Sequence, residues 1–347
     1  MNVVIAGGGF CGTLVAKYLD NDHDIKTTLI DKKDFFEYSP GLHKVITRPG
    51  ILKYMRVSYQ SLLKNTTIIT DTIKTITPKK ITTESNRQFA FDYLVICTGI
   101  DYPIFLDNTE NVYSLKRGRD AKAIANKIDS AESILIVGGG LIGTEIAGEL
   151  VLKRPKKKIT IVHLNDRLLE RNKKKASFFA QKFLEKNGAN IMFDEKITKH
   201  QNGELITENG KTINAGLTIW CAGIKANPSF MNAFPRNCFT SKNALNVNNN
   251  LQLNGFPNIF VGGDINSIKE EKTARKAKIH AKFISKNLKR MTQKKPLLNY
   301  TPRSSFQVIS LGDFAGIIQY HTIVFNGFMI PGFFKVAAGL LTRIQMM

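Results

Sequence analysis

Residues 134–150 read ILIVGGGLIGTEIAGEL and residues 3–12 read VVIAGGGFCG, so the same kind of stretch occurs twice in the chain. In both, a short apolar run predicts a buried strand, glycines follow in the spacing G-x-G-x-x-G, and apolar residues then recur at helical spacing. The glycines of the first stretch are Gly7, Gly8, Gly9 and Gly12, and those of the second are Gly138, Gly140 and Gly143. The repeat predicts two dinucleotide-binding turns, and therefore an α/β fold with two Rossmann-like domains.

Each glycine of such a turn has a physical task. The first permits the tight turn, the second lets the backbone approach a pyrophosphate, and the third allows the helix to pack closely on the strand. The start of the helix adds N–H donors and the positive end of its dipole, which favour phosphate. After the first turn, the strand TTLID ends at Asp31, 19 residues beyond Gly12, where a carboxylate can accept both hydroxyls of an adenosine ribose. The first turn is therefore predicted to bind a dinucleotide.

The second turn lacks that acid. Its second strand, ITIVH, places His163 at the expected position, 20 residues beyond Gly143. A carboxylate there would favour a free 2′-hydroxyl and repel a 2′-phosphate, whereas a protonated His163 or the nearby Arg167 could attract the phosphate. Alternatively, His163 only ends the strand and the backbone holds the ribose. NADH and NADPH therefore both remain open.

Two dinucleotide sites in one chain are most simply filled by FAD at the first turn and a nicotinamide nucleotide at the second, one donating a hydride and the other storing it. Residues 91–100, FDYLVICTGI, and 216–224, GLTIWCAGI, predict strands that end in Thr98-Gly99 and in Gly223, where the chain would cross between domains. Residues 258–267, NIFVGGDINS, predict a strand that ends in Gly263 and Asp264. Asp264 either accepts hydrogen bonds from the ribityl chain of a flavin or is an ordinary turn aspartate.

A helix is predicted over residues 272–290, KTARKAKIHAKFISKNLKR, with an apolar stripe and a basic stripe. The apolar stripe consists of Ala274, Ala277, Ala281, Ile284 and Leu288. Small side chains at the start, Thr273 and Ala274, would let the helix approach the ring of a flavin. The helix dipole would then stabilise negative charge on the reduced ring.

Composition narrows the class of protein. The 347 residues carry a formal net charge of +22, with basic runs such as KRPKKK at 153–158, which suit a solvated surface, nucleic acid or anionic lipid. The four cysteines show no C-x-x-C spacing, so we expect neither a redox-active disulfide beside a flavin nor a metal site. A strand predicted to begin at residue 2 or 3 leaves no room for a signal peptide, and a cytoplasmic location is expected.

The motifs together resemble the FAD-dependent pyridine nucleotide-disulfide oxidoreductase superfamily, and within it the type II NADH:quinone dehydrogenases and the apoptosis-inducing-factor-like group with its ferroptosis-suppressor branch. The stretches that carry the resemblance are GGGFCG, YSPGLHKV, FDYLVICTG, GGGLIGTEIAGEL, WCAGIKAN and LNVNNNLQLNGFPNIFVGGDIN. The resemblance implies an FAD-binding domain at 1–103 and 247–295, an NAD(P)H-binding domain at 104–246, and a C-terminal segment at 296–347. It also implies that Glu145 faces the stacked rings and orients the nicotinamide or assists proton transfer. The alternative is an ordinary glutamate near a helix start.

One departure concerns the acceptor. Type II dehydrogenases commonly have two glutamines at the start of the flavin-facing helix, lining the quinone pocket, and this chain has Arg275 and Ile279 there. The quinone contacts of those relatives therefore cannot be transferred to this sequence.

The C-terminal segment is rich in aromatic residues and has only four charged residues from Thr301 to Met347. Strands are predicted around 304–311 and 316–325, followed by an amphipathic helix from about 332 that could lie in a membrane interface. Alternatively, its apolar stripe packs on the protein's own core or on a second subunit in a homodimer. In the type II dehydrogenases that this chain resembles, this part docks on the bilayer.

The sequence thus predicts an FAD-dependent NAD(P)H dehydrogenase that passes electrons to a quinone, peripheral on the cytoplasmic face of the membrane. One alternative is a soluble reductase of a ferredoxin- or rubredoxin-type partner, which would suit the basic surface. Another is a basic, nucleic-acid-binding protein, but no aromatic residues are interleaved with the basic runs, so no nucleic acid partner is expected. A sulfide:quinone oxidoreductase is disfavoured because no paired cysteines are evident.

Overall fold

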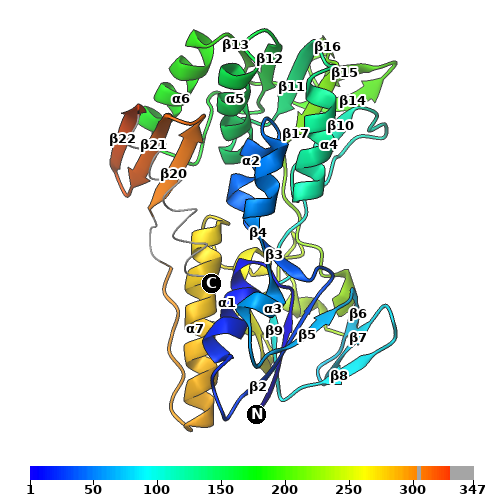
Figure 1. The fold of residues 1–347 in the computed structure, drawn as a ribbon, viewed down its shortest axis with the longest axis vertical. Helices are drawn as coiled ribbons and strands as arrows, with labels where there is room; N and C mark the ends of the chain where they lie inside the picture. The colour runs from blue at the N-terminus through cyan, green and yellow to red at the C-terminus, as the bar shows by residue number, and fades with distance from the viewer. Residues whose placement is uncertain (303–305, 329–347) are drawn as a thin grey trace.

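The computed structural model describes residues 1–302 and 306–328, which form two parallel-sheet units, one above the other in Figure 1. The six-stranded sheet has the order β18-β19-β9-β1-β2-β5 and the five-stranded sheet the order β10-β17-β11-β12-β13. The strands of the first are β18 (Gln252–Leu253), β19 (Phe256–Val261), β9 (Tyr93–Ile96), β1 (Asn2–Ala6), β2 (Lys26–Asp31) and β5 (Thr67–Thr70). Those of the second are β10 (Val112–Ser114), β17 (Leu217–Trp220), β11 (Ser133–Val137), β12 (Lys158–Val162) and β13 (Ala189–Met192). The predicted α/β class with two Rossmann-like units is confirmed.

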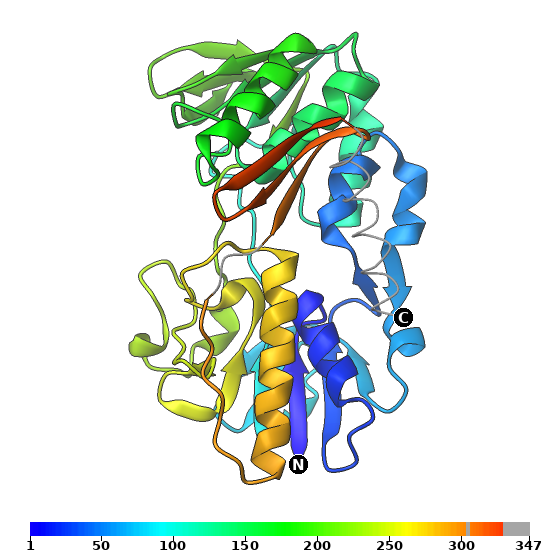
Figure 2. The same cartoon turned by 90° about the vertical axis from the view of Figure 1, so that its left-hand side faces the viewer.

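Helices cover the central strands, which is why those strands read as nearly continuous apolar runs. The first sheet carries α1 (Phe10–Leu19) and α7 (Ala274–Thr292), which pack against each other (Figure 2). The second carries α4 (Gly118–Ile128), α5 (Leu141–Lys153) and α6 (Lys174–Lys186). The helix predicted over 272–290 is confirmed as α7, and four members of its apolar stripe, Ala277, Ala281, Ile284 and Leu288, are buried.

Between β9 and β19 the chain crosses to the second unit and back. It leaves the first after β9 and returns to place β19 parallel to β9 in the same sheet. The two crossing segments pair with each other, because Asp101 N donates to Lys225 O at 2.7 Å and Lys225 N donates to Asp101 O at 2.9 Å. The ends of β9 and β17 are thereby brought close together.

Smaller elements complete the molecule. The first unit adds the hairpin β3 (Phe35–Glu37) and β4 (Arg56–Ser58), the short helices η1 (Ser39–Gly41), α2 (Leu42–Val45), η2 (Pro49–Met55) and α3 (Tyr59–Leu62), and the sheet of β6 (Ile73–Ile76), β7 (Lys80–Thr83) and β8 (Gln88–Ala90). The second adds β14 (Ile197–Gln201), β15 (Glu204–Thr207) and β16 (Thr212–Asn214). Single turns η3 (Ser229–Met231), η4 (Arg236–Cys238) and η5 (Gly263–Ile265) lie along the return path. Helix α2 packs on α4 and α5, so it reaches the second unit.

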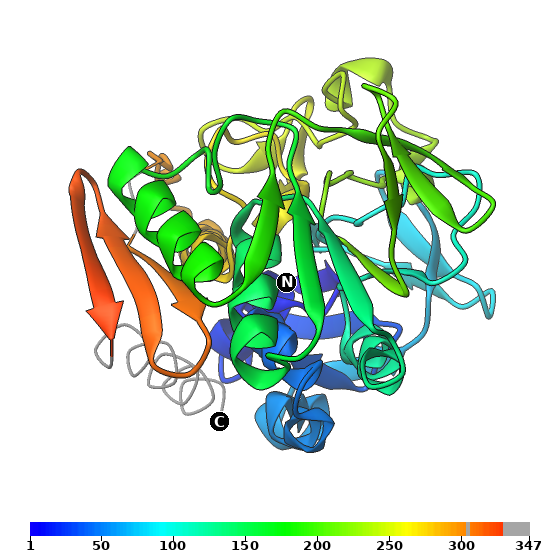
Figure 3. The ribbon, with the colours of Figure 1, turned by 90° about the horizontal axis from the view of Figure 1, so that it is seen from above.

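A three-stranded antiparallel sheet follows α7. It consists of β20 (Gln307–Leu311), β21 (Ala315–Tyr320) and β22 (Ile323–Phe328), and it packs on α5 and α6 (Figure 3). The single strand predicted around 316–325 is wrong, because a two-residue turn at His321 and Thr322, with His321 at φ 50°, splits it into β21 and β22. The helix predicted from about 332 lies outside the described residues. Among the helices of residues 1–302 and 306–328, none is long and apolar enough to cross a membrane.

Candidate functional site: two nucleotide-binding turns

The first glycine turn follows β1 and has the geometry that a pyrophosphate requires. Gly7 has φ 98°, and a Cβ on it would lie 2.7 Å from the Cys97 carbonyl oxygen. A Cβ on Gly12 would collide with the Gly7 carbonyl, so only glycine lets α1 pack this closely. A Cβ on Gly9 would meet no atom within 4 Å, so the chain leaves the space beside this backbone open. This is the open approach expected of the second fingerprint glycine.

Asp31 lies at the end of β2, directly beside this turn. Gly7 N donates to Ile30 O at 2.8 Å, and Gly8 N donates to Asp31 Oδ2 at 2.6 Å. The other side of the turn is held by the buried Tyr59, whose hydroxyl donates to Gly8 O at 2.6 Å. Burial raises the pKa of Tyr59 well above its ordinary value, so the hydroxyl remains a donor. The turn and its acid are therefore fixed to each other by contacts within the protein.

The second turn repeats this geometry. Gly138 has φ 107°, a Cβ on Gly143 would collide with the Gly138 carbonyl, and a Cβ on Gly140 would meet no atom within 4 Å. Gly138 N donates to Val162 O at 2.8 Å, which matches the bond from Gly7 to Ile30. The next amide then donates to a side chain, as in the first turn, but the acceptor is the Nδ1 atom of His163 at 3.1 Å. An imidazole thus occupies the place of the Asp31 carboxylate.

The residues predicted at the crossovers lie beside these turns. A Cβ on Gly7 would come within 3.0 Å of the Thr98 Cα, and the Thr98 Oγ1 atom is buried without a hydrogen-bond partner among the described residues. Gly99 and Gly223 have φ 73° and 77°, which lets the chain turn out of each sheet. Tyr102, on the first crossover, has its pKa raised by burial and then by Asp264 and Cys221. This side chain therefore lies near the edges of both sheets.

Gly263 and Asp264 also lie beside the first turn. Gly263 has φ 74°, and a Cβ on it would be 3.4 Å from the Cys11 Cβ of α1. Burial raises the pKa of Asp264, and this outweighs the opposite effect of the nearby Lys272 and His280 side chains. The Asp264 carboxylate also acts to raise the pKa of Cys11 in α1, so it lies close to the first glycine turn.

The start of α7 rests on a buried charged cluster that the sequence analysis missed. Thr273 caps the helix, its Oγ1 accepting from Lys276 N at 3.3 Å. Glu270 lies 2.6 Å from Lys276 Nζ and 2.7 Å from His280 Nε2, and Tyr300 donates to it at 3.0 Å. Burial acts to raise the pKa of Glu270, but hydrogen bonds from His280 and Lys276 outweigh it and lower the value to about 2.

This cluster reaches the first turn through His280. Its Nδ1 accepts from Gly263 N at 3.2 Å, so the Glu270–His280 pair fixes the loop that carries Asp264. One feature of the sequence could have indicated this cluster. Lys276 and His280 are polar residues one helical turn apart, on the otherwise apolar side of the helix.

Glu145 is buried and lies where three segments meet. Its Oε1 accepts from Ser310 N in β20 at 3.0 Å, and its Oε2 is 3.7 Å from His43 Nδ1 in α2. His43 belongs to the YSPGLHKV stretch, and its contact with Glu145 was not foreseen. The glutamate therefore links the first unit, α5 and the C-terminal sheet.

Two cysteines that are distant in sequence are close in space. A Cβ on Gly262 would meet the Sγ atoms of both Cys11 and Cys97, and both residues are buried free thiols. Burial and then the Cys97 thiol raise the pKa of Cys11 well above its ordinary value. The Cys11 thiol is therefore a poor nucleophile, because the thiolate is the reactive form.

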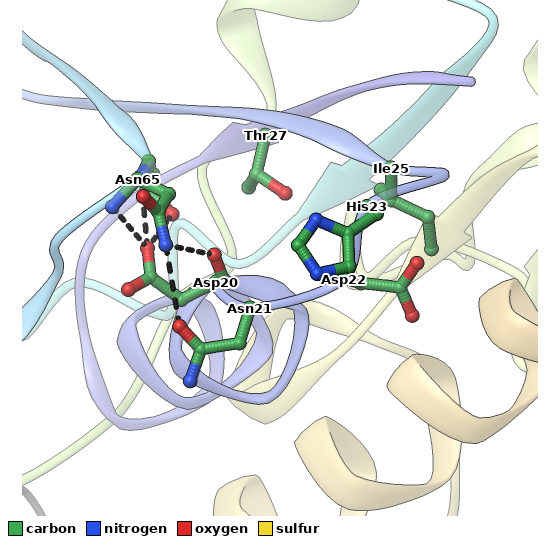
Figure 4. A pocket seen from close by; sticks show the side chains of 8 residues that line it. Asp20, Asn21, Asp22, His23, Ile25, Thr27 and Asn65 are labelled. Atoms are coloured by element: carbon green, nitrogen blue, oxygen red, sulfur yellow. Dashed lines mark hydrogen bonds between the residues drawn. The ribbon is translucent and has the colours of Figure 1, made fainter.

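A cavity of about 460 Å³ lies at the opposite edge of the first sheet, before β2 begins (Figure 4). Asp20 in its wall accepts from Lys64 N at 2.7 Å and from Thr66 N at 2.8 Å, which holds the loop leading to β5. In open parallel sheets, ligands bind at the carboxyl ends of the strands. The cavity lies at the amino ends of the strands, where a nucleotide is not expected, whereas both glycine turns lie at the carboxyl ends.

Comparisons with known proteins agree with this geometry. A profile of the family described as pyridine nucleotide-disulphide oxidoreductase matches residues 1–281. The apoptosis-inducing factor homolog A of Dictyostelium discoideum is 29% identical, covering 99% of this chain and 90% of its own, and the ferroptosis suppressor protein 1 of Taeniopygia guttata is 27% identical, covering 92% and 88%.

Two solved structures have the same fold. The sulfide:quinone oxidoreductase of Aquifex aeolicus has a TM-score of 0.88 at 20% identity, covering 99% of this chain and 91% of its own. The NDH2 of Plasmodium falciparum in complex with NADH has a TM-score of 0.82 at 16% identity, covering 97% and 94%. At these identities the structures show the fold alone.

Proposed function

Because the chain belongs to the pyridine nucleotide-disulphide oxidoreductase family, we propose that it is an NAD(P)H:quinone oxidoreductase acting at a membrane surface. It is a flavoprotein oxidoreductase, with FAD as cofactor and NADH or NADPH as substrate. In the proposed arrangement, FAD binds the unit formed by 1–103 and 247–295, the nicotinamide nucleotide binds 104–246, and the segment 296–347 docks on the membrane. When bound, the flavin accepts a hydride from the nicotinamide and passes electrons on.

The observation that carries the proposal is the matched pair of turns on two sheets whose crossovers pair at Asp101 and Lys225. Around the first turn, Asp31 accepts the ribose hydroxyls, and Asp264 accepts from the ribityl chain. Thr273 and Ala274 at the start of α7 direct the positive end of the helix dipole at the ring, which stabilises negative charge there. Around the second turn, Gly140 lets the backbone approach the pyrophosphate.

Glu145 is proposed to orient the nicotinamide. Its carboxylate is held by Ser310 N and His43, so its position is fixed by contacts from outside its own helix. Because the carboxylate is already ordered, it can accept a hydrogen bond from the carboxamide of the nicotinamide without a further loss of conformational entropy.

The membrane part of the proposal is supported by exposed apolar side chains on β22 and in the turn between β20 and β21. Phe314 and Phe325 are 68% and 66% exposed, and Ile323 is also exposed. Large apolar side chains that face solvent in this way suit insertion into a lipid surface, and the basic surface would add attraction to anionic headgroups. The neighbour from Aquifex aeolicus is named a sulfide:quinone oxidoreductase and has the same fold, so this fold is compatible with a quinone acceptor.

Stopped-flow mixing tests the reaction. The purified yellow protein is mixed with NADH or NADPH and then with a ubiquinone or menaquinone analogue, while flavin absorbance is followed. We expect bleaching by the nucleotide and recovery of the yellow form by the quinone. A flavin that the nucleotide reduces but no quinone reoxidises would support a soluble reductase of a ferredoxin-type partner instead.

Flotation with anionic liposomes tests the location. We expect the protein to float with the vesicles and the double variant Phe314→Ser/Phe325→Ser to remain in solution. Tyr18→Ser is the matched control, because Tyr18 is an exposed aromatic residue on α1, outside the C-terminal sheet. A wild-type protein that does not float would contradict the proposed docking.

A further inference from the structure

The second turn contains an acid that the sequence motif does not place. The strand β12 ends before His163, whose Nδ1 accepts from Gly139 N at 3.1 Å, as the Asp31 carboxylate accepts from Gly8 N at 2.6 Å. Because Nδ1 is the acceptor, the proton of the neutral ring is on Nε2. The His163 side chain is 8% exposed, and Nε2 has no hydrogen-bond partner among the described residues.

Glu170 lies next to that atom. The loop after β12 folds back over the turn, and Leu169 N donates to Gly139 O at 2.9 Å. This brings the Glu170 Oε2 atom to 3.3 Å from His163 Nε2, but outside hydrogen-bonding geometry, and Oε2 also has no hydrogen-bond partner in the described part of the chain. A buried donor and an acceptor thus lie side by side, both unsatisfied, at the place where a Rossmann fold recognises the adenosine ribose.

The two arginines of this loop, Arg167 and Arg171, both have partners within the protein. The Arg167 guanidinium donates to the backbone carbonyls of Glu170 at 2.5 Å and Asn172 at 3.2 Å, so it closes the loop on itself. Arg171 lies between two carboxylates, 3.7 Å from Glu170 and 3.6 Å from Glu271. Neither arginine is arranged as the open cationic site that a 2′-phosphate requires.

We propose that Glu170 and His163 together form the ribose-recognition site of the second turn and select a nucleotide with a free 2′-hydroxyl, NADH, over its 2′-phosphorylated form. The His163 Nε2–H donates to a ribose hydroxyl oxygen, and the Glu170 carboxylate accepts the hydrogen of a hydroxyl. A 2′-phosphate would instead bring its negative charge against the carboxylate. This inference rests on the proposed binding of the nicotinamide nucleotide at residues 104–246.

Binding of two fragments tests the selection without turnover. Isothermal titration of the flavin-loaded protein compares ADP-ribose with ADP-ribose 2′-phosphate. We expect ADP-ribose to bind at least about tenfold more tightly, a difference of ~1.4 kcal/mol. In Glu170→Gln, the ratio of the two dissociation constants should fall toward one, because ADP-ribose binds more weakly and ADP-ribose 2′-phosphate binds more tightly.

The matched control is Glu271→Gln, which removes the same charge and the other carboxylate beside Arg171. We expect its ratio to equal that of the wild-type protein, which would exclude release of Arg171 as the cause. The double variant Glu170→Gln/His163→Asp restores a carboxylate in the geometry of Asp31 and is expected to regain the preference for ADP-ribose.

Equal wild-type affinity for the two fragments would overturn the inference, and so would an unchanged ratio in a folded Glu170→Gln protein. The wild-type comparison does not depend on any variant folding. If neither fragment binds, the failure lies with the proposed nucleotide site itself, and the two outcomes are therefore distinguishable.

Discussion

Replacing Glu270 with glutamine tests whether the charged cluster below α7 stabilises the fold. The Glu270 side chain is 5% exposed and contacts two side chains that are just as buried, the Lys276 ammonium at 2.6 Å and the His280 imidazole at 2.7 Å. Glutamine preserves the shape but removes the negative charge. The ammonium of Lys276 then loses the carboxylate that compensates for its burial, which is the costly way to break a buried pair.

The magnitude follows from the pKa of Glu270. Folding lowers it from 4.5 to about 2. At ~1.4 kcal/mol per pKa unit, this corresponds to roughly 3 kcal/mol of stability at neutral pH. Because the folded pKa is the lower one, the contribution is complete above the unfolded value and is lost as the pH falls toward the folded value. The difference between wild-type and variant should therefore shrink by about 1 kcal/mol or more between pH 7 and pH 3.5.

Urea unfolding monitored by far-UV circular dichroism measures this difference at both pH values, with flavin fluorescence reporting release of the cofactor. Glu271→Gln is the control, because Glu271 is the adjacent glutamate and is far more exposed. We expect the control to change the free energy of unfolding by less than about 0.5 kcal/mol. A Glu270→Gln loss below 1 kcal/mol, or a loss that does not depend on pH, would refute the reasoning.

Three further changes probe the turns and the C-terminal sheet. Gly140→Val places side-chain atoms in open space, so thermal unfolding should be unchanged while the affinity for NADH, measured by titration, falls at least about tenfold, or ~1.4 kcal/mol. Tyr59→Phe removes the hydrogen bond to Gly8 O, which should cost about 1 kcal/mol in urea unfolding and increase the flavin lost on dialysis. Burial opposes ionisation of Asp313, but Lys153 and Arg48 lower its pKa overall, so its stabilisation is lost as the pH falls below about 4. Asp313→Asn should accordingly reduce the melting temperature at pH 7 and have a smaller effect at pH 3.5.

The parts of the fold that the sequence predicted are those encoded by local patterns. Both glycine turns, their flanking strands and α7 could be predicted because the apolar periodicity and the glycine spacing occur within about 30 residues. The turn that separates β21 from β22 could not be predicted, because His321 and Thr322 are neither glycine nor proline and do not indicate a turn. The adjacency of Cys11 and Cys97 was hidden for another reason, since it depends on β1 and β9 being neighbours in the sheet.

The site was predicted less completely than the turns, because its polar contacts join distant segments. His163 was identified by position, but the contact with Glu170 depends on how the loop after β12 folds back. The same is true of Glu145, whose contacts come from α2 and β20. Such contacts have no spacing rule, since each is set by tertiary packing rather than by the period of one element.

The two turns have the same backbone geometry, but the segments around them differ. This difference explains how one chain can retain one nucleotide and exchange the other. Beside the first turn, β19 ends in Gly263 and Asp264, and α7 follows, with the loop fixed by His280. The equivalent strand of the second sheet, β10, ends at Ser114 and is followed by α4, and within the described residues it has no counterpart of the Gly263–Asp264 turn. More fixed contacts lower the rate at which a ligand leaves, because each must break before release. The unit with Asp264 is therefore expected to hold the flavin as a prosthetic group, and the unit with His163 to release its nucleotide after each turnover.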